Sequence, residues 1–191
     1  TIGINDTSRF PTPAVTAEVK SRLFQALPPS GRAYWPRNIA EMDILRAAAN
    51  GHQIRVVGDP SLSTIAVEQS DCGLDWMRLS LKTAHYSKEV DTQIIGSGPL
   101  TNLALAAQCA YDQGVPPDAI AQVMGNFSLY RRKMELVPLN LAGKSVVLLD
   151  DCHNATLISF KNVLSHIGKF KHSRRRRILV IGRIAHIEGS E

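Results

Sequence analysis

The sequence predicts an α/β protein that divides near residue 135. Segments with apolar residues at helical spacing alternate with short aliphatic or alternating runs along the 191-residue chain, which is the pattern of mixed α/β folds. Near the carboxyl end, an aliphatic run at 145–149 precedes an acidic turn, a helical pattern at 157–167 and a second aliphatic run at 178–181. This strand–helix–strand order is typical of a parallel sheet. We therefore expect the tail of one domain joined to the start of a second, parallel-sheet domain.

Periodicity and punctuation residues define the elements of the first part. Pro13 can open the first helix, and Gly51 and Gly114 can end later ones. Glycine, proline, aspartate and serine separate the strand-like runs between them. In chain order, the expected elements are a helix at 13–27, a strand at 32–35, a helix at 38–50, strands at 54–57, 62–67, 74–81 and 90–95, and helices at 100–113 and 117–127.

The composition is that of an ordinary globular protein. Hydrophobic residues make up 44% and charged residues 20% of the chain, and the length is sufficient to bury a core. No apolar run approaches the roughly 20 residues that cross a bilayer, so we expect no membrane partner. The first residues lack the basic start of a signal peptide and resemble the interior of a longer chain. Three unpatterned cysteines indicate a reducing compartment.

The acidic turn is the first candidate site. Asp150 and Asp151 follow the aliphatic run 145–149, which reads as a buried strand, and ligands of open α/β sheets lie at the carboxyl ends of strands. Carboxylates there could hold magnesium or a ribose. They could equally form a solvated strand end at which Asp151 or Asn154 caps the next helix. The residues alone support both interpretations evenly.

A basic run near the carboxyl end is the second candidate. Six positive charges fall within nine residues at Lys169, Lys171 and 174–177, in a chain of net charge +5. Such a run can bind nucleic acid or anionic membrane. No aromatic residues interleave it, as a single-strand platform requires. We favour a solvated loop and do not expect a nucleic-acid partner. His166, which lies among polar neighbours, is also expected to face solvent.

Four segments resemble the Mur ligases, ATP-dependent enzymes that extend the peptide of peptidoglycan precursors. They match in order and spacing over almost the whole chain, and the type that adds D-alanyl-D-alanine to UDP-N-acetylmuramoyl-tripeptide (the MurF type) is the member most resembled. L-L-D-D-C-H-N-A-T at 148–156 resembles L-L-D-D-S-Y-N-A-N, and R-R-K-M-E at 131–135 occupies the place of G-R-x-E. The segment at 96–107 resembles G-x-H-N-x-x-N-A-x-A-A, and that at 2–24 resembles the family's amino-terminal motif.

The resemblance implies a fold, cofactors and substrates. Residues 1–134 are expected to form the carboxyl-terminal part of a P-loop-type central ATPase domain, and residues 135–191 the start of the Rossmann-like carboxyl-terminal domain. The implied cofactors are ATP and Mg²⁺. The implied reaction joins D-alanyl-D-alanine to the carboxylate of a UDP-N-acetylmuramoyl peptide through an acyl phosphate. Bacterial cytoplasm is the implied compartment, with a plastid as the alternative.

The resemblance also implies site residues, carried over from matching motif positions. Asp6 falls on the family's metal-binding histidine and could ligate magnesium through oxygen. No catalytic residue is implied. The expected cofactor-binding residues are Asn102, Lys133, Asp151, His153 and Asn154.

The chain departs from the family at several of these positions. Gly98 and Pro99 replace the H-N pair, and Lys133 replaces an arginine, whose bidentate fork a lysine cannot reproduce. The phosphate-cradling G-x-x-G-K-[ST] loop does not occur in the sequence. We therefore expect this chain alone to be inactive, with a missing amino-terminal region or a partner chain supplying the loop. Two alternatives stay open: a non-catalytic interaction or scaffold domain, and, with less support, a basic nucleic-acid-binding module.

Overall fold

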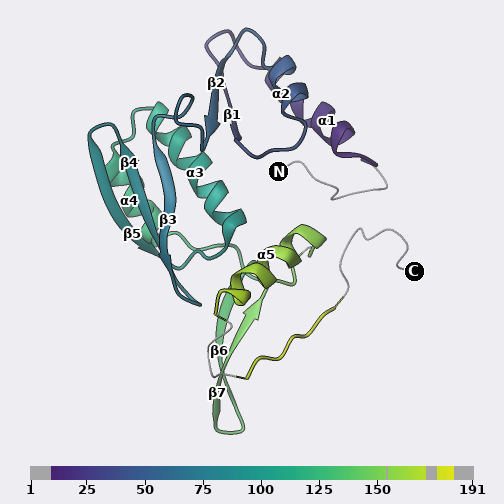
Figure 1. The fold of residues 1–191 in the computed structure, drawn as a ribbon, viewed down its shortest axis with the longest axis vertical. Helices are drawn as coiled ribbons and strands as arrows, with labels where there is room; N and C mark the ends of the chain where they lie inside the picture. The colour runs from purple at the N-terminus through teal and green to yellow at the C-terminus, as the bar shows by residue number, and fades with distance from the viewer. Residues whose placement is uncertain (1–9, 154, 171–175, 183–191) are drawn as a thin grey trace.

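The chain has a mixed α/β fold, as the sequence predicts. The computed structural model describes residues 10–153, 155–170 and 176–182 (Figure 1). The helices are α1 (Pro13–Gln25), α2 (Met42–Ala48), α3 (Ser97–Asp112), α4 (Pro117–Asn126) and α5 (Leu157–Gly168). The strands are β1 (Arg32–Pro36), β2 (Gln53–Val57), β3 (Ala66–Cys72), β4 (Met77–Thr83), β5 (Tyr86–Thr92), β6 (Glu135–Leu141) and β7 (Lys144–Asp150).

The amino-terminal part is a parallel pair of strands, β1 and β2, covered by α1 and α2. Thr12 caps α1, because its Oγ accepts a hydrogen bond from the backbone N–H of Val15 at 3.2 Å, and Pro13 follows at the first helical position. The helix expected at 38–50 is shorter, since Glu41 takes a left-handed φ of 59° immediately before α2. Trp35, only 2% exposed, is the largest side chain of this core.

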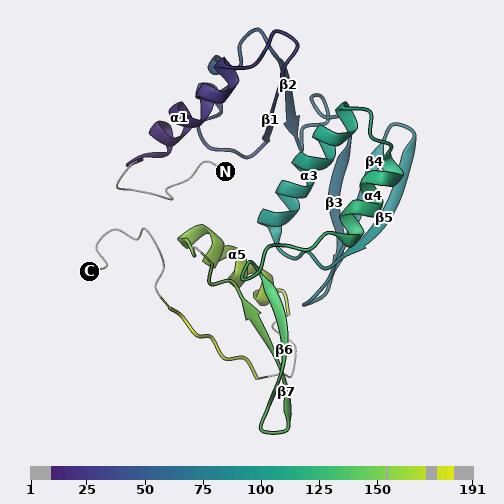
Figure 2. The ribbon, with the colours of Figure 1, turned by 180° about the vertical axis from the view of Figure 1, so that it is seen from behind.

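The central unit consists of the antiparallel sheet β3–β4–β5 and the helices α3 and α4, which cover one face (Figure 2). Met77, Leu79 and Leu81 on β4 are fully buried. They are alternate residues and so point to one face of the strand. Each of the three strands lies a few residues from its expected range, because the sequence pattern locates the apolar positions better than the turns between them. β4 is the central strand of this sheet, between β3 and β5, and its apolar face packs against α3 and α4.

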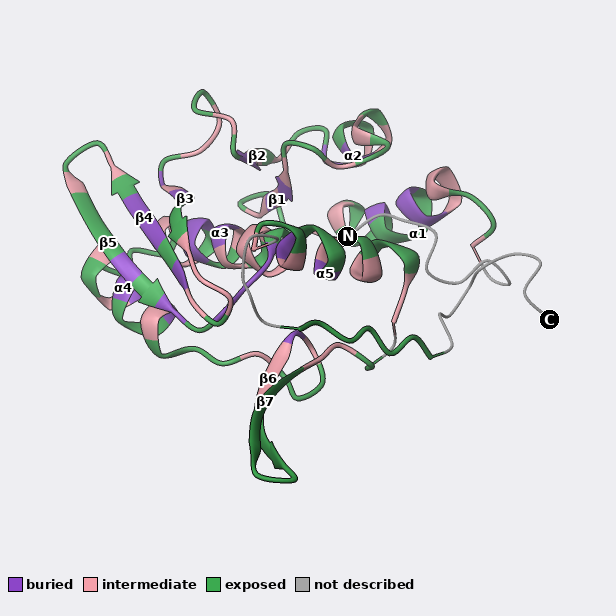
Figure 3. Cartoon of the chain, turned by 60° about the horizontal axis from the view of Figure 1, so that its bottom comes forward, coloured by how far each residue is buried: buried purple, intermediate pink, exposed green. Residues whose placement is uncertain are grey.

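The carboxyl-terminal unit comprises β6, β7, α5 and residues 176–182, and it corrects two predictions. β7 was expected to be a buried strand of a parallel sheet. It pairs antiparallel with β6 and its residues are largely exposed (Figure 3). Residues 178–181, expected to form a second strand, have no strand assignment and are all exposed. Their aliphatic pattern is that of strands covered on both faces, but no described residues supply those covering layers. Among the described residues, no helix is long and apolar enough to span a bilayer.

Candidate functional site

The connector between α4 and β6 (residues 129–134) lies against the acidic turn after β7 (residues 150–153). The antiparallel register pairs Glu135 with Asp150, so the residues before β6 lie opposite those after β7. The backbone N–H of Met134 donates to Asp151 Oδ1 at 3.0 Å. The backbone N–H of His153 donates to the carbonyl oxygen of Arg132 at 3.1 Å. Two predicted motifs, 17 or more positions apart in sequence, are thus joined directly.

The connector has an unusual backbone. Arg132 (φ 62°) and Met134 (φ 53°) are both left-handed, a conformation that costs an ordinary residue roughly 1–2 kcal/mol. Two features compensate: the Glu135 carboxylate accepts from the backbone N–H of Arg132 at 2.9 Å, and the Met134 side chain is buried with Ile95. Arg132 stands where the resembled G-R-x-E pattern has glycine, so a glycine-type conformation persists without the glycine.

The two aspartates of the acidic turn have opposite electrostatic environments. Burial raises the pKa of Asp151, against the opposing effects of the Met134 N–H and the nearby Lys133 charge. Hydrogen bonds from the thiol and the backbone N–H of Cys152 lower the pKa of Asp150. The Asp150 carboxylate therefore accepts hydrogen bonds from within its own turn. Asp151 is the carboxylate that faces the connector.

An exposed aromatic pair borders the same junction. The Tyr130 and His153 rings have centroids 5.4 Å apart at an interplanar angle of 64°, an edge-to-face arrangement. Tyr130 is 73% exposed, and His153 is exposed as well. Exposed ring faces of this kind can stack on a planar base. Tyr130 was not among the predicted site residues, and only its position within the connector draws attention to it.

The structure does not place the remaining predicted site residues at the junction. Asn102 lies on α3, exposed and without a hydrogen bond to any described residue. Asp6 and Asn154 lie outside the described residues. The alternative in which Asp151 or Asn154 caps the next helix is wrong, because Thr156 caps α5 in a reciprocal capping box with Ser159.

Helix α5 covers the amino end of α3, where the family's H-N pair is replaced. The hydroxyl of Ser97 donates to Asn162 Oδ1 at 3.3 Å, and a Cβ on Gly98 would lie 3.3 Å from Asn162 Nδ2. His166, expected to face solvent, is 2% exposed, with its Nε2 3.0 Å from the carbonyl oxygen of Leu74. The prediction that His166 faces solvent is wrong. Its hydrogen-bond partner lies 92 residues away in the sequence, so the neighbouring residues gave no sign of its burial. No local signal in the sequence identifies Asn162 or His166 as docking residues.

The junction presents a carboxylate, a cation and exposed rings. Asp151 Oδ2 and the Lys133 ammonium make no hydrogen bond to a described residue. Within residues 10–153, 155–170 and 176–182, no group of three or more His, Cys, Asp or Glu side chains could hold a metal ion. In general a carboxylate can accept from a sugar hydroxyl, exposed rings can stack on a base and a lysine attracts phosphate.

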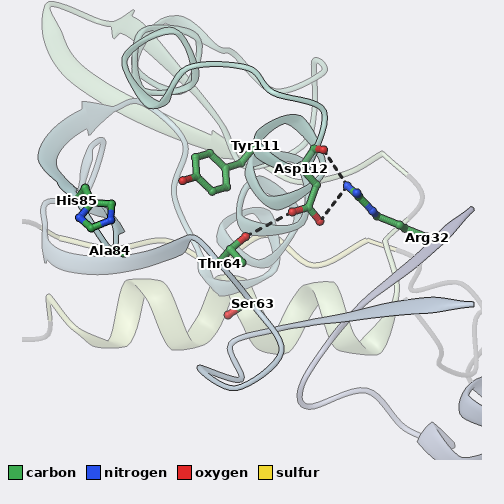
Figure 4. A pocket seen from close by; sticks show the side chains of 7 residues that line it. All are labelled: Arg32, Ser63, Thr64, Ala84, His85, Tyr111 and Asp112. Carbon is green, nitrogen blue, oxygen red and sulfur yellow. Dashed lines mark hydrogen bonds and ion pairs between the residues drawn. The ribbon is translucent and has the colours of Figure 1, made fainter. Parts of the chain in front are cut away.

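A second polar cluster lies at the other end of α3, and its charges are already paired. The Asp112 carboxylate accepts from Arg55 Nε at 2.9 Å, from the Tyr34 hydroxyl at 3.2 Å and from Gln108 at 3.1 Å. It borders an open hollow of about 680 Å³ (Figure 4). A helix the length of α3 places its two ends roughly 24 Å apart. Asp112 thus ties the amino-terminal strands to the central unit and does not belong to the connector junction.

No protein-family model and no curated protein sequence matches the chain. Solved structures do match, and they are Mur ligases, so the fold of this chain is a Mur ligase fold. The MurF of Acinetobacter baumannii aligns with 88% of the chain at 20% identity and a TM-score of 0.77. The fold resemblance predicted from the motifs is therefore confirmed.

Two further structures extend this likeness. The MurF ligase of Thermotoga maritima in complex with ADP aligns with 88% of the chain at 14% identity and a TM-score of 0.71. A murein peptide ligase from Psychrobacter arcticus 273-4 aligns with 81% at 16% identity and a TM-score of 0.56. The matches cover 36%, 38% and 32% of the three relatives, so the chain spans about a third of their length.

Proposed function

We propose that this chain is a divergent part of a MurF-type ligase and contributes one wall of its nucleotide site. In this assignment residues 1–134 belong to the P-loop-type central domain and residues 135–191 begin the Rossmann-like domain. The observation that carries the proposal is the junction of connector and acidic turn. Its two hydrogen bonds, Met134 to Asp151 and His153 to Arg132, join the two motifs that the family resemblance places in the ATP cleft.

The roles of the residues follow from their chemistry. Asp151 Oδ2 would accept hydrogen bonds from a ribose hydroxyl, and the exposed His153 ring would stack on the adenine. Lys133 would attract phosphate oxygens as a point charge. Asn102 would supply an amide from α3, and Asn154 and Asp6 stay candidates by motif position. In the complete ligase, ATP would activate the carboxylate of the UDP-N-acetylmuramoyl peptide for attack by D-alanyl-D-alanine.

The chain alone is proposed to be inactive. The sequence has no phosphate-cradling loop, so the backbone donors and lysine that hold a triphosphate are missing. Asn162 and the rest of α5 also cover the start of α3, where the family has its H-N pair. A preceding region or a partner chain would supply the loop. The proposed compartment is the bacterial cytoplasm, with a plastid as the alternative.

Calorimetric titration of the purified chain with magnesium-ATP and with ADP tests the nucleotide wall. We expect measurable binding that Asp151→Ala weakens, because the substitution removes the free acceptor. Asp43→Ala, which removes an exposed carboxylate on α2, is the matched control and should bind as the wild type does. Absence of heat with either nucleotide would overturn the proposal. Phosphate release with UDP-N-acetylmuramoyl-tripeptide and D-alanyl-D-alanine would contradict the predicted inactivity.

A non-catalytic interaction domain is the second candidate, and the exposed apolar surface of the carboxyl-terminal unit favours it. Val146, Val147 and Leu148 are between 37% and 45% exposed, and contiguous apolar surface often marks a protein interface. The two candidates separate in the same titration. An interaction domain would show no nucleotide binding and no effect of Asp151→Ala.

A further inference from the structure

The connector holds Lys133 between two residues in the left-handed conformation. Arg132 precedes it with a φ of 62°, and Met134 follows it with a φ of 53°. Residues other than glycine keep this conformation only where the surrounding contacts impose it. The contacts around Arg132 and Met134 therefore decide the direction in which the Lys133 side chain leaves the backbone.

Three hydrogen bonds fix the peptide groups on either side of Lys133. On its amino side, the N–H of Arg132 donates to Glu135 Oε2 at 2.9 Å, and the carbonyl oxygen of Arg132 accepts from the N–H of His153 at 3.1 Å. On its carboxyl side, Asp151 Oδ1 accepts from the next backbone N–H at 3.0 Å. His153 and Asp151 belong to the acidic turn. Glu135 is the partner that comes from outside this turn.

The Glu135 carboxylate is anchored by the strand that carries it. Glu135 is the first residue of β6, and it pairs with Asp150 of β7 in the antiparallel register. Its Oε1 also lies 3.7 Å from Nε of Arg131, but the Arg131 side chain is 88% exposed, and solvated ion pairs of this kind contribute little. The charge-assisted bond to the Arg132 N–H is therefore the stronger of the two contacts.

Lys133 is the cation that this backbone places beside the acidic turn. It is half-buried, whereas Arg131 and Arg132 are exposed. Its charge lies close enough to the Asp151 carboxylate to oppose the effect of burial on the pKa of that group. A lysine is a point charge on a flexible stem, so the orientation of its backbone decides which positions the ammonium can reach.

We propose that Glu135 is a positioning residue of the nucleotide site, which holds the Arg132 backbone left-handed and so directs the Lys133 ammonium toward the phosphate oxygens of a bound nucleotide. This inference rests on the proposed function and adds to it a residue that does not itself touch the ligand. Without the Glu135 carboxylate, Arg132 would relax toward the right-handed region that ordinary residues prefer. The peptide between Arg132 and Lys133 would then turn, and Lys133 would keep its charge but not its direction.

Calorimetric titration of the full chain with magnesium-ATP tests this role. Glu135→Ala and Glu135→Gln remove the same charge, but glutamine keeps an oxygen that can accept from the Arg132 N–H. We therefore expect Glu135→Ala to bind about tenfold more weakly than Glu135→Gln. Combining Glu135→Ala with Lys133→Ala should cause no loss beyond that of Lys133→Ala alone. Glu18→Ala removes an exposed carboxylate on α1, and this matched control should bind as the wild type does.

Amide hydrogen exchange of the nucleotide-free chain, followed by NMR, measures the hydrogen bond directly. In Glu135→Ala the N–H of Arg132 should exchange about tenfold faster than in Glu135→Gln. The N–H of Met134, which Asp151 holds, should change less and provides an internal control. Equal exchange of the Arg132 N–H in both variants would overturn the positioning role.

The titration separates failure of this inference from failure of the proposed function. A wild-type chain that binds no nucleotide would overturn the proposed function and this inference with it. A wild-type chain that binds, with Glu135→Ala binding as tightly as Glu135→Gln, would overturn the inference alone. A further loss of affinity in the double variant would also overturn it, because a residue that only maintains the fold would add its effect to that of Lys133.

Discussion

The central unit and the carboxyl-terminal unit use similar apolar strands with opposite results. In the central unit, α3 and α4 cover β4, and its Met77, Leu79 and Leu81 are fully buried. In the carboxyl-terminal unit, Val147 and its neighbours on β7 are more than a third exposed. An apolar pattern thus indicates only that a strand would be stabilised by covering layers. The neighbouring elements decide whether it receives them.

The two units meet through one small buried cluster. Ile95 from the central unit packs with Met134 of the connector and Val163 of α5, and the His166 ring bonds to the Leu74 carbonyl. The docking elements are therefore α5 and the connector, while the β6–β7 hairpin extends away from the central unit (Figure 3). This division explains why the proposed nucleotide wall lies at the junction and not on the hairpin.

The largest expected difference between the two units is the effect of truncating an apolar strand residue. Leu79→Ala should lower the free energy of unfolding by about 3 kcal/mol, because it leaves a cavity in a closed core. Val147→Ala should cost less than about 0.5 kcal/mol when the chain is monomeric, because the side chain already contacts water. Urea unfolding followed by circular dichroism measures both. Equal losses would show that β7 is buried in solution.

Removal of the Asp112 carboxylate should have the next largest effect. Asp112→Ala removes the carboxylate that accepts from Arg55 and Tyr34 and should cost about 2 kcal/mol. Asp91→Ala is the matched control, because Asp91 pairs with Arg78 at 2.6 Å but is 61% exposed. It should cost less than about 1 kcal/mol. A similar cost for both would indicate that the Asp112 cluster is as solvated as a surface pair.

Glycine at position 132 should stabilise the chain. Arg132 has a φ of 62°, which glycine adopts freely, so Arg132→Gly should raise the free energy of unfolding by about 1 kcal/mol. Arg131→Gly provides the control, since Arg131 is not among the residues with positive φ and is 88% exposed. That control should be neutral or slightly destabilising. Thermal unfolding of the two variants decides the matter, and a loss of stability in Arg132→Gly would contradict the strained connector.

The smallest expected effect concerns the pH dependence of Asp151. Burial raises its pKa in the folded chain, so the folded state binds a proton more readily than the unfolded state and the ionised form costs stability. Asp151→Asn should therefore be more stable than the wild type at neutral pH. The gain should disappear as the pH falls below the ordinary carboxyl pKa of about 3.9. Urea unfolding at several pH values measures this, and a gain that grows on acidification would show the opposite shift.

Local elements were largely predictable. The α1 start at Pro13, the alternation on β4 and the α4 range follow from capping, period-two patterning and proline chemistry, which act over a few residues. The motifs also indicated the fold, and solved Mur ligase structures confirmed it. The strand predicted at 178–181 was wrong, since a strand requires a neighbour as well as an apolar run.

The candidate site was predictable in type but not in arrangement. Asp151, Lys133 and His153 were expected from the motifs, and the structure brings their segments together at the connector junction. Tyr130 and Asn162 were missed, because nothing in their own sequence neighbourhoods marks them. Asn102, also expected from the motifs, lies on α3, which begins at Ser97.

Local chemistry and long-range contact therefore account for different parts of this molecule. Capping residues, apolar periodicity and motif spacing were sufficient to define the α/β class and the acidic turn at Asp151. The burial of His166, the left-handed backbone of Arg132 and the exposure of β7 required the folded chain. Each of these depends on residues distant in sequence that supply, or fail to supply, a partner. Burial and pairing are properties of neighbours in space, and for that reason a pattern along one segment could not reveal them.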